Sequence, residues 1–177
     1  RLGLELYDFY RRRGDRLAWN GPWGPLVQAD RLLEALRGLT IDGLKPEDYG
    51  VNALVATIDS LRNPAGKGRL VVRRQADLDI ALTAAFLRSA RHLLAGRVAI
   101  KKADANWQVL TQVGNLSGLL EMALSTNQVR QTLLGLRPRR VEYRRLQGAR
   151  LQLLELASRG GWPQIPSTAS SGRLDRK

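Results

Sequence analysis

The chain has 177 residues, of which 44% are hydrophobic and 25% charged, and this composition is typical of a globular domain with a real core. Lys and Arg outnumber Asp and Glu by 29 to 16, which gives a formal net charge of +13. There is no cysteine and a single histidine, His92, which excludes disulfides, thiolate metal sites, cysteine nucleophiles and multi-histidine zinc sites. No apolar run reaches about 18 residues, so no membrane span is expected.

The positive charge, nearly all of it arginine, bears on the class of partner. A basic surface attracts polyanions, which include nucleic acid, anionic lipid and a cell-wall polymer rich in carboxylates. The other interpretation is that arginine fills solvated positions, as it does in proteins from GC-rich genomes. The composition leaves both interpretations open.

The first part of the chain contains spacings that predict two helices separated by a loop. Apolar residues recur at helical intervals over residues 2–13, which indicates a first helix with an aromatic face. Residues 19–24 hold two glycines and a proline and are expected to form a loop. Pro25 suits the first turn of a second helix that ends near Gly38.

A third helix and a flexible segment are expected before the strongest helical periodicity in the sequence. Pro46 is expected in the first turn of a helix that runs to about Leu61. Residues 63–68, rich in glycine with one proline, predict a flexible break. Residues 70–73 could form a brief strand, but the sequence offers no partner strand.

The strongest helical periodicity covers about residues 75–95 and predicts a central buried helix that Gly96 ends as a cap. Asp77 and Asp79 point about 200° apart around a helix axis. They are therefore expected to provide favourable charge at the helix N-terminus rather than an acid–base pair. The expected buried stripe consists of Leu78, Leu82, Ala85, Phe86, Ser89 and Leu93.

The C-terminal part predicts further helices and no sheet. Short helices are expected over residues 116–124 and 127–134, and a long arginine-rich helix over about residues 139–158. Sustained alternation of apolar and polar residues is missing, so the predicted class is all-α. We expect one compact multi-helix domain over residues 1–166, with residues 167–177 as a linker or a truncated boundary toward a following domain.

Several short motifs follow one another in a fixed order. They are Phe9-Tyr10 followed by Trp19, Gly43-Leu44-x-Pro46-x-x-Tyr49, Asp77-Leu-Asp79-x-x-Leu82-Thr83-x-Ala85-Phe86, Gly96-Arg97-Val98 with Trp107, Leu136-Arg-Pro138, Tyr143-x-x-Leu146 and Gly160-Gly-Trp-Pro163. Together they cover about residues 6–166 and resemble the scaffold domain of long periplasmic L,D-transpeptidases. One departure is Ala99-Ile-Lys-Lys, which stands where that family usually has a proline.

The resemblance implies a helical scaffold that positions the catalytic domain of an enzyme that remodels peptidoglycan in the periplasm of the Gram-negative envelope. The implied partners are peptidoglycan, the catalytic domain of the chain's own parent and other cell-wall enzymes. Enzymes of this family work through a cysteine acyl-enzyme, and a chain without cysteine cannot form that thioester. The chain itself is therefore expected to be non-catalytic, with any catalysis located elsewhere in the parent.

Exposed aromatic and basic side chains are the candidates for a glycan or partner surface. Trp23 lies in a Gly-Pro-Trp-Gly loop and is the best candidate for an exposed contact, whereas Trp107 and Trp162 are expected to anchor loops to the core. Arginines bind carboxylates through two parallel hydrogen bonds, although a solvated helix face is the other interpretation. The candidate residues are Trp23, Arg137, Arg139, Arg140, Arg144 and Arg145.

No catalytic, cofactor-binding or metal-binding residue is predicted, and two further functions stay open. A basic helical module could bind nucleic acid through its phosphates. The spread of arginines along the chain and the lack of a helix-turn-helix pattern disfavour that function. A stand-alone periplasmic regulator built on the same scaffold is the other possibility, and the sequence does not distinguish it from an excised fragment.

Overall fold

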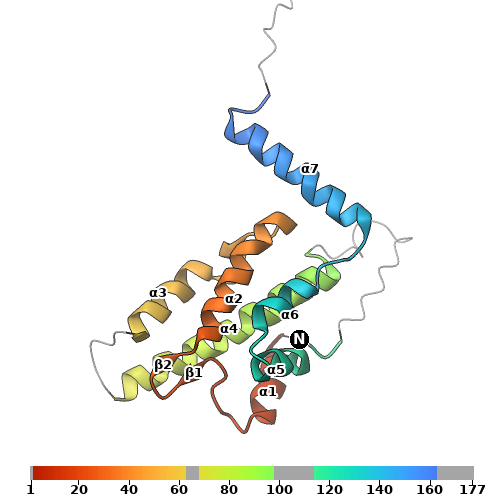
Figure 1. Ribbon diagram of the computed structural model, residues 1–177. Coiled ribbons are helices and arrows are strands. Elements are labelled where there is room, and N and C mark those ends of the chain that lie inside the picture. The colour runs from red at the N-terminus through yellow and green to blue at the C-terminus, as the bar shows by residue number, and fades with distance from the viewer. Residues whose placement is uncertain (1, 63–67, 98–113, 163–177) are drawn as a thin grey trace, which may run out of the picture. The chain divides into compact units, whose positions relative to one another are not determined.

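The computed structural model describes residues 2–62, 68–97 and 114–162, and these residues are mostly helical (Figure 1). The α-helices are α1 (Leu2–Arg12), α2 (Val27–Gly38), α3 (Val51–Arg62), α4 (Arg69–Ala95), α5 (Leu116–Ser125), α6 (Val129–Gly135) and α7 (Val141–Ser158). There are also two 3-10 helices, η1 (Leu39–Asp42) and η2 (Pro46–Tyr49), and a hairpin of strands β1 (Asn20–Gly21) and β2 (Gly24–Pro25). The predicted all-α class is confirmed.

Contacts divide the chain into two units, Arg1–Arg140 and Val141–Lys177. The first unit contains the hydrophobic core, whereas α7 in the second has no buried residue. This division was not predicted, and the domain over residues 1–166, with residues 167–177 as a linker or truncated boundary, stays a prediction. None of the described helices has the length and apolar character needed to cross a membrane.

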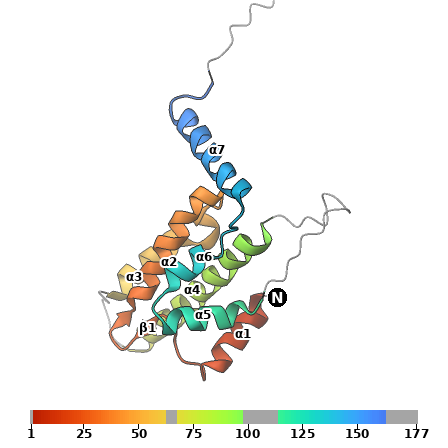
Figure 2. The same cartoon turned by 45° about the vertical axis from the view of Figure 1, so that its right-hand side comes forward.

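Helix α4 is the central element of the first unit. It packs against α1, α2, α3, α5, α6 and η2. In the views of Figure 1 and Figure 2, α2 and α3 lie on one side of α4, and α1 and α5 lie on the other. All six residues of the predicted stripe are buried, with no more than 5% exposure: Leu78, Leu82, Ala85, Phe86, Ser89 and Leu93. The central buried helix is therefore confirmed.

Three large aromatic side chains join the N-terminal segment to this helix. Phe9 from α1, Trp19 from the segment before the hairpin and Phe86 from α4 are each 0% exposed. Burying a side chain of this size contributes about 1.5–3 kcal/mol relative to leaving it in water. The core thus depends on contacts between residues far apart in sequence.

The hairpin occupies the segment that was expected to be a loop. Its antiparallel strands are joined by a two-residue turn of Pro22 and Trp23. Pro25 belongs to β2, so the expectation that it opens the second helix is wrong, and α2 begins two residues later. The cause is a hydrogen bond from the backbone N–H of Leu26 to the carbonyl of Trp19, at 2.8 Å, which continues the pairing beyond Pro25.

Gly24 fixes the position of the hairpin beside the end of α3. Its φ is +112°, a conformation that other residues rarely adopt. A β-carbon at Gly24 would also lie 3.3 Å from the carbonyl oxygen of Leu61. Only glycine allows the strand to approach this carbonyl without strain.

Two helix boundaries differ from those predicted. Helix α4 begins at Arg69 rather than near residue 75 and includes residues 70–73, where a brief strand was considered. Val71 packs against the core, while Leu70 and Val72 stay exposed at 66% and 62%. The helix also pairs backbone groups that a strand without a partner would leave unpaired. The helix predicted from Pro46 is interrupted at Gly50, whose φ of +71° separates η2 from α3.

We expect Gly24→Ala to lower the free energy of unfolding by about 1–3 kcal/mol, because alanine must adopt a strained positive φ against the Leu61 carbonyl. Gly38→Ala is the matched control, since a β-carbon there meets nothing within 4 Å. It should leave stability unchanged or raise it by up to about 1 kcal/mol. Urea unfolding followed by circular dichroism measures both, and equal stability of the two variants would contradict the constraint at Gly24.

Candidate functional site

A buried carboxylate on α4, that of Asp79, holds the segment that leads into the hairpin. Its Oδ1 accepts hydrogen bonds from the backbone N–H of Ala18 at 2.7 Å and the hydroxyl of Tyr10 at 2.8 Å. Its Oδ2 accepts from the backbone N–H of Trp19 at 2.8 Å and the side-chain amide of Asn20 at 2.9 Å. Asp79 is 0% exposed, and these four donors replace the water that it lost on burial.

Thr83, one turn further along α4, extends this network. Its hydroxyl accepts a hydrogen bond from the indole N–H of Trp19 at 2.9 Å and lies 2.9 Å from the hydroxyl of Tyr10. Burial, followed by the charge of Asp79, raises the pKa of Tyr10 well above its ordinary value. The phenol therefore keeps its proton and remains a hydrogen-bond donor.

The expectation that Asp77 and Asp79 charge the N-terminus of the central helix is wrong. Helix α4 begins at Arg69, about two turns earlier, and Asp79 points into the core while Asp77 is exposed. The buried role of Asp79 was missed, although its spacing from Leu82 and Phe86 places it on the same helix face.

Trp23, at the turn of the hairpin, is the most exposed large hydrophobic side chain in the described residues, at 98%. Two neighbours, Leu26 at 43% and Val27 at 64%, are also exposed. We call these three residues the hairpin-tip patch. The structure therefore places Trp23 where solvent or a partner can reach it, while its role in binding stays a prediction.

Two other tryptophans, Trp107 and Trp162, were predicted to anchor loops to the core, and the structure describes only the second. Trp162 was expected to anchor a loop, but it is 76% exposed. It follows Gly160 and Gly161, whose positive φ angles of 101° and 80° end the helical unit, and α7 offers no buried face against which it could pack. Trp107 lies outside the described residues.

Arg137, one of the candidate surface arginines, is used within the first unit. Its Nε donates to both carboxylate oxygens of Asp42, at 3.1 and 2.9 Å, and its Nη2 donates to the same carboxylate at 2.7 Å. The Asp42 side chain is only 1% exposed, so this pair joins the end of α6 to η1. Arg139 and Arg140 are exposed in the first unit, and Arg144 and Arg145 are exposed in the second.

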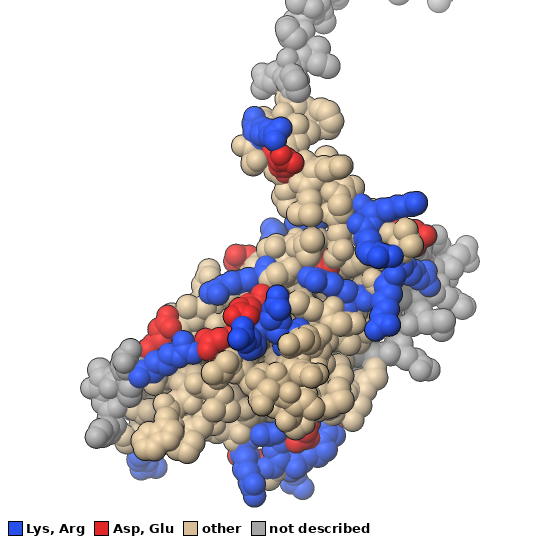
Figure 3. All heavy atoms as spheres, in the orientation of Figure 1, with Lys and Arg blue, Asp and Glu red and all other residues tan. Residues whose placement is uncertain are grey.

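Many other cations of the first unit are paired with carboxylates. On the face drawn in Figure 3, basic and acidic side chains lie interspersed toward the left of the view, whereas toward the right basic side chains gather with few acidic ones. The described pairs include Arg13–Glu121, Arg31–Glu34, Arg62–Asp30, Arg91–Glu5 and Arg97–Asp48. These pairs occupy part of the basic side chains, but 29 cations against 16 carboxylates leave an excess of 13 that one-to-one pairing cannot neutralise.

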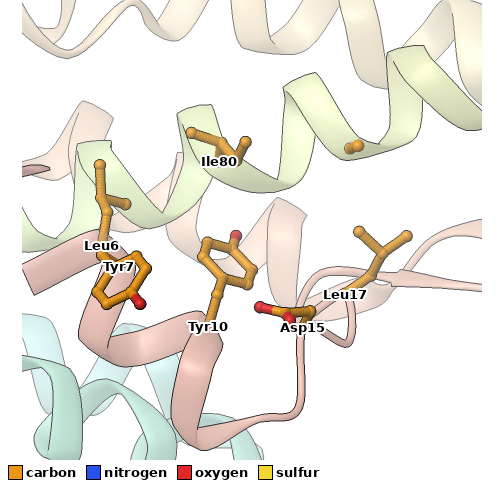
Figure 4. Close-up of a pocket in the computed structure, with 7 residues that line it drawn as sticks. Leu6, Tyr7, Tyr10, Asp15, Leu17 and Ile80 are labelled. Atoms are coloured by element: carbon orange, nitrogen blue, oxygen red, sulfur yellow. The ribbon is translucent and has the colours of Figure 1, made fainter.

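An apolar groove lies beside the Asp79 network, between α1 and α4 (Figure 4). Its volume is about 380 Å³, which is within the range of small-molecule sites. Its lining consists of Leu6, Tyr7, Tyr10, Asp15, Leu17, Ala76 and Ile80. The hydroxyl of Tyr10 is already bonded to Asp79, so the groove offers mainly apolar contact and few groups for chemistry.

The single histidine takes part in a second polar contact between elements. The hydroxyl of Tyr49 in η2 lies 2.9 Å from Nδ1 of His92 on α4. Burial, followed by the charges of Arg97, Arg88 and Arg91, lowers the pKa of His92. Burial also raises the pKa of Tyr49 to about 12, so a protonated phenol facing a neutral imidazole is favoured.

These observations define a class of protein, a helical domain that a buried polar network holds together. Within residues 2–62, 68–97 and 114–162, no group of three or more His, Cys, Asp or Glu residues could hold a metal ion. The model of the Scaffold domain family matches residues 5–149, which is more than half of the chain. The chain belongs to the Scaffold domain family. Comparisons with curated proteins and with solved structures gave no match.

We expect Asp79→Ala to cost at least about 3 kcal/mol of stability, because two backbone N–H groups and two side-chain donors lose a buried acceptor. Asp77→Ala is the matched control, since Asp77 is an exposed aspartate on the same helix, and it should change stability by less than about 0.5 kcal/mol. Urea unfolding provides both values. Similar losses in the two variants would mean that Asp79 does not hold the fold.

Stability should also fall as the pH is lowered from 7.5 to 5.5. The pKa of His92 is lower in the folded protein than the value of about 6.5 in the unfolded chain, so the unfolded state takes up the proton first. The loss therefore begins below about pH 6.5. His92→Gln, which keeps an acceptor for the Tyr49 hydroxyl, should reduce this dependence. Urea unfolding midpoints of both proteins at the two pH values measure this dependence. An equal change of the midpoint with pH in His92→Gln would show that His92 is not the group responsible.

Proposed function

We propose that the chain is the non-catalytic scaffold of a periplasmic L,D-transpeptidase in the Gram-negative envelope. In this role it holds the catalytic domain of its parent chain in position for peptidoglycan remodelling. Membership of the Scaffold domain family over residues 5–149 is the observation that carries the proposal. The transpeptidase assignment rests on the series of motifs in the sequence.

The position of the motif residues in the fold supports this proposal. Tyr10, Trp19, Asp79 and Thr83 belong to the motif series, and together they build the buried network. All four lie inside the residues that the family model matches. The resemblance therefore involves residues that determine the fold, which a chance likeness of surface residues would not do.

The residue chemistry of the chain supports a structural role rather than a catalytic one. An acyl-enzyme needs a thiolate, and the chain has no cysteine. Its histidine, His92, is bonded to Tyr49 and not to a serine or a carboxylate. Any acyl transfer in the parent would therefore use residues outside these 177.

Peptidoglycan is the second partner that we propose, with other cell-wall enzymes as further partners. Arg139 and Arg140 are exposed in the first unit, as are Arg144 and Arg145 in the second. Guanidinium groups pair with carboxylates, and the stem peptides of peptidoglycan carry carboxylates. These residues, rather than Arg137, are the ones to test for wall binding, because Arg137 is committed to Asp42.

Nucleic-acid binding is the competing function, and the spread of the arginines along the chain and the lack of a helix-turn-helix pattern argue against it. A phosphate-binding surface needs several free cations along one path, and its affinity falls steeply with salt. Gel shifts at physiological ionic strength, with heparin as a competitor, separate the two functions. Salt-sensitive binding to nucleic acid that persists in the presence of heparin would favour the competing function over a role in peptidoglycan remodelling.

The purified chain should form no cross-links from muropeptides, whereas its full-length parent should form them. Deleting residues 1–166 from the parent should lower cross-linking by about tenfold or more, because correct placement of reacting groups contributes strongly to rate. Analysis of the products by liquid chromatography and mass spectrometry measures all three. The parent with its catalytic cysteine changed to alanine is the control for non-enzymatic products.

Two results would overturn the proposed function. One is cross-linking by the purified chain alone, because that would require a nucleophile which the proposal denies. The other is a parent reading frame that encodes no domain with a cysteine and a histidine. A stop codon directly after Lys177 would instead assign the chain to the stand-alone regulators.

A further inference from the structure

A short segment of the first unit, residues 44–49, lies between two glycine turns. Gly43 before it and Gly50 after it have positive φ angles of 77° and 71°. Glycine changes its backbone angles at low cost, so both turns are suited to act as hinges. The segment contains η2, packs against α2, α3 and α4, and buries Leu44 and Tyr49, which are 8% and 5% exposed. We call residues 44–49 the η2 flap.

Polar contacts attach the η2 flap to one end of α4 and to the turn after it. Nη1 of Arg88 donates to the backbone carbonyl of Asp48 at 3.1 Å. Nη1 of Arg97 donates to the carboxylate of the same aspartate at 2.6 Å. The third contact joins the hydroxyl of Tyr49 to Nδ1 of His92, at 2.9 Å. The flap is therefore held by two cationic side chains and by one side chain that can become cationic.

The surroundings of this histidine carry an excess of positive charge. Three arginines act on the imidazole, and Asp48 is the carboxylate that opposes them. Glu5 of α1 offsets one further charge, because it pairs with Arg91. Lys45 and Glu47, the other charged residues of the flap, are exposed. The charged groups that act on the Tyr49–His92 pair, directly or through a partner, are Glu5 on α1, Asp42 on η1, Asp48 on η2, Arg88 and Arg91 on α4, and Arg97 after α4.

A proton on His92 would therefore work against the closed flap. The imidazolium could still donate from Nδ1 to the oxygen of Tyr49, so the hydrogen bond alone does not decide the outcome. Repulsion by the arginines and partial burial both disfavour the charged ring in its present position. An open flap gives the ring access to water, where its charge costs less. Acid thus favours the open position.

We propose that protonation of His92 releases the η2 flap from α4, with Gly43 and Gly50 as the hinges, so that the flap is an acid-sensitive switch. Opening would remove Tyr49 from the groove of about 300 Å³ that it lines between α3 and α4, and would bring Leu44 into water. The switch needs no partner or bound group. It is independent of the proposed function, and either can fail without the other.

Thiol labelling tests the switch, because the chain has no cysteine of its own. Leu44→Cys places a single thiol in the flap, and Leu120→Cys, at a fully buried position of α5, is the matched control. The reagent is 4,4′-dithiodipyridine, used at pH 7.5 and pH 5.5. Each labelling rate is divided by the rate of the same variant unfolded in urea at the same pH, which gives an apparent opening constant.

The opening constant at position 44 should exceed that at position 120 by about tenfold or more at both pH values, because local opening costs less than unfolding of the core. Between pH 7.5 and pH 5.5 it should rise by about three- to tenfold, where the upper limit is that of one histidine with a pKa of about 6.5 in the open state. Adding His92→Gln, which keeps an acceptor for Tyr49, should remove the rise. Equal opening constants at the two positions, or a rise that persists in His92→Gln, would overturn the proposal.

A second measurement avoids any substitution in the flap, since Leu44→Cys could itself loosen it. The N–H of Leu44 donates to the carbonyl of Leu39 at 3.2 Å, and this bond spans the hinge at Gly43. Its hydrogen exchange in the unsubstituted chain, followed by NMR and corrected for the intrinsic rate at each pH, should accelerate by the same factor of about three to ten. Unchanged protection of this amide at pH 5.5 would also overturn the proposal.

Discussion

The carboxylate of Asp79 is the group on which the first unit depends. A carboxylate with 0% exposure is tolerated because four protein donors take the place of water. These donors lie 59 to 69 positions away along the chain, so the hydrogen bonds attach the N-terminal segment to α4. The hairpin, and with it the placement of Trp23, follows from this attachment.

The same arrangement explains why the domain is suited to holding other parts in place. A reactive site keeps a nucleophile or a base open toward a pocket. Here the polar side chains of the network bond to one another, and the hydroxyl of Tyr10 is engaged by Asp79 even though the ring lines the groove between α1 and α4. The stabilising hydrogen bonds and the exposed surfaces thus belong to different residues.

Helical periodicity was sufficient to locate most elements, because an apolar stripe on a helix is a local property. It identified the buried face of α4 from Leu78 to Leu93 without knowledge of the partners. The hairpin was not predicted, because strands of two residues are too short to show an alternation of apolar and polar residues. The role of Asp79 could not be predicted, because its hydrogen-bond donors are distant in sequence. The exposure of Trp162 could not be predicted either, because the sequence does not show that α7 lacks a buried face against which the indole could pack.

The separation between Ala18 and Asp79 also bears on how the protein reaches its native state. A chain leaves a ribosome in order, so Ala18 emerges 61 residues ahead of the carboxylate that binds it. During that interval Phe9 and Trp19, both fully buried at the end, have no α4 to cover them. The N-terminal segment is therefore the part of the nascent polypeptide most exposed to chaperones, proteases and aggregation.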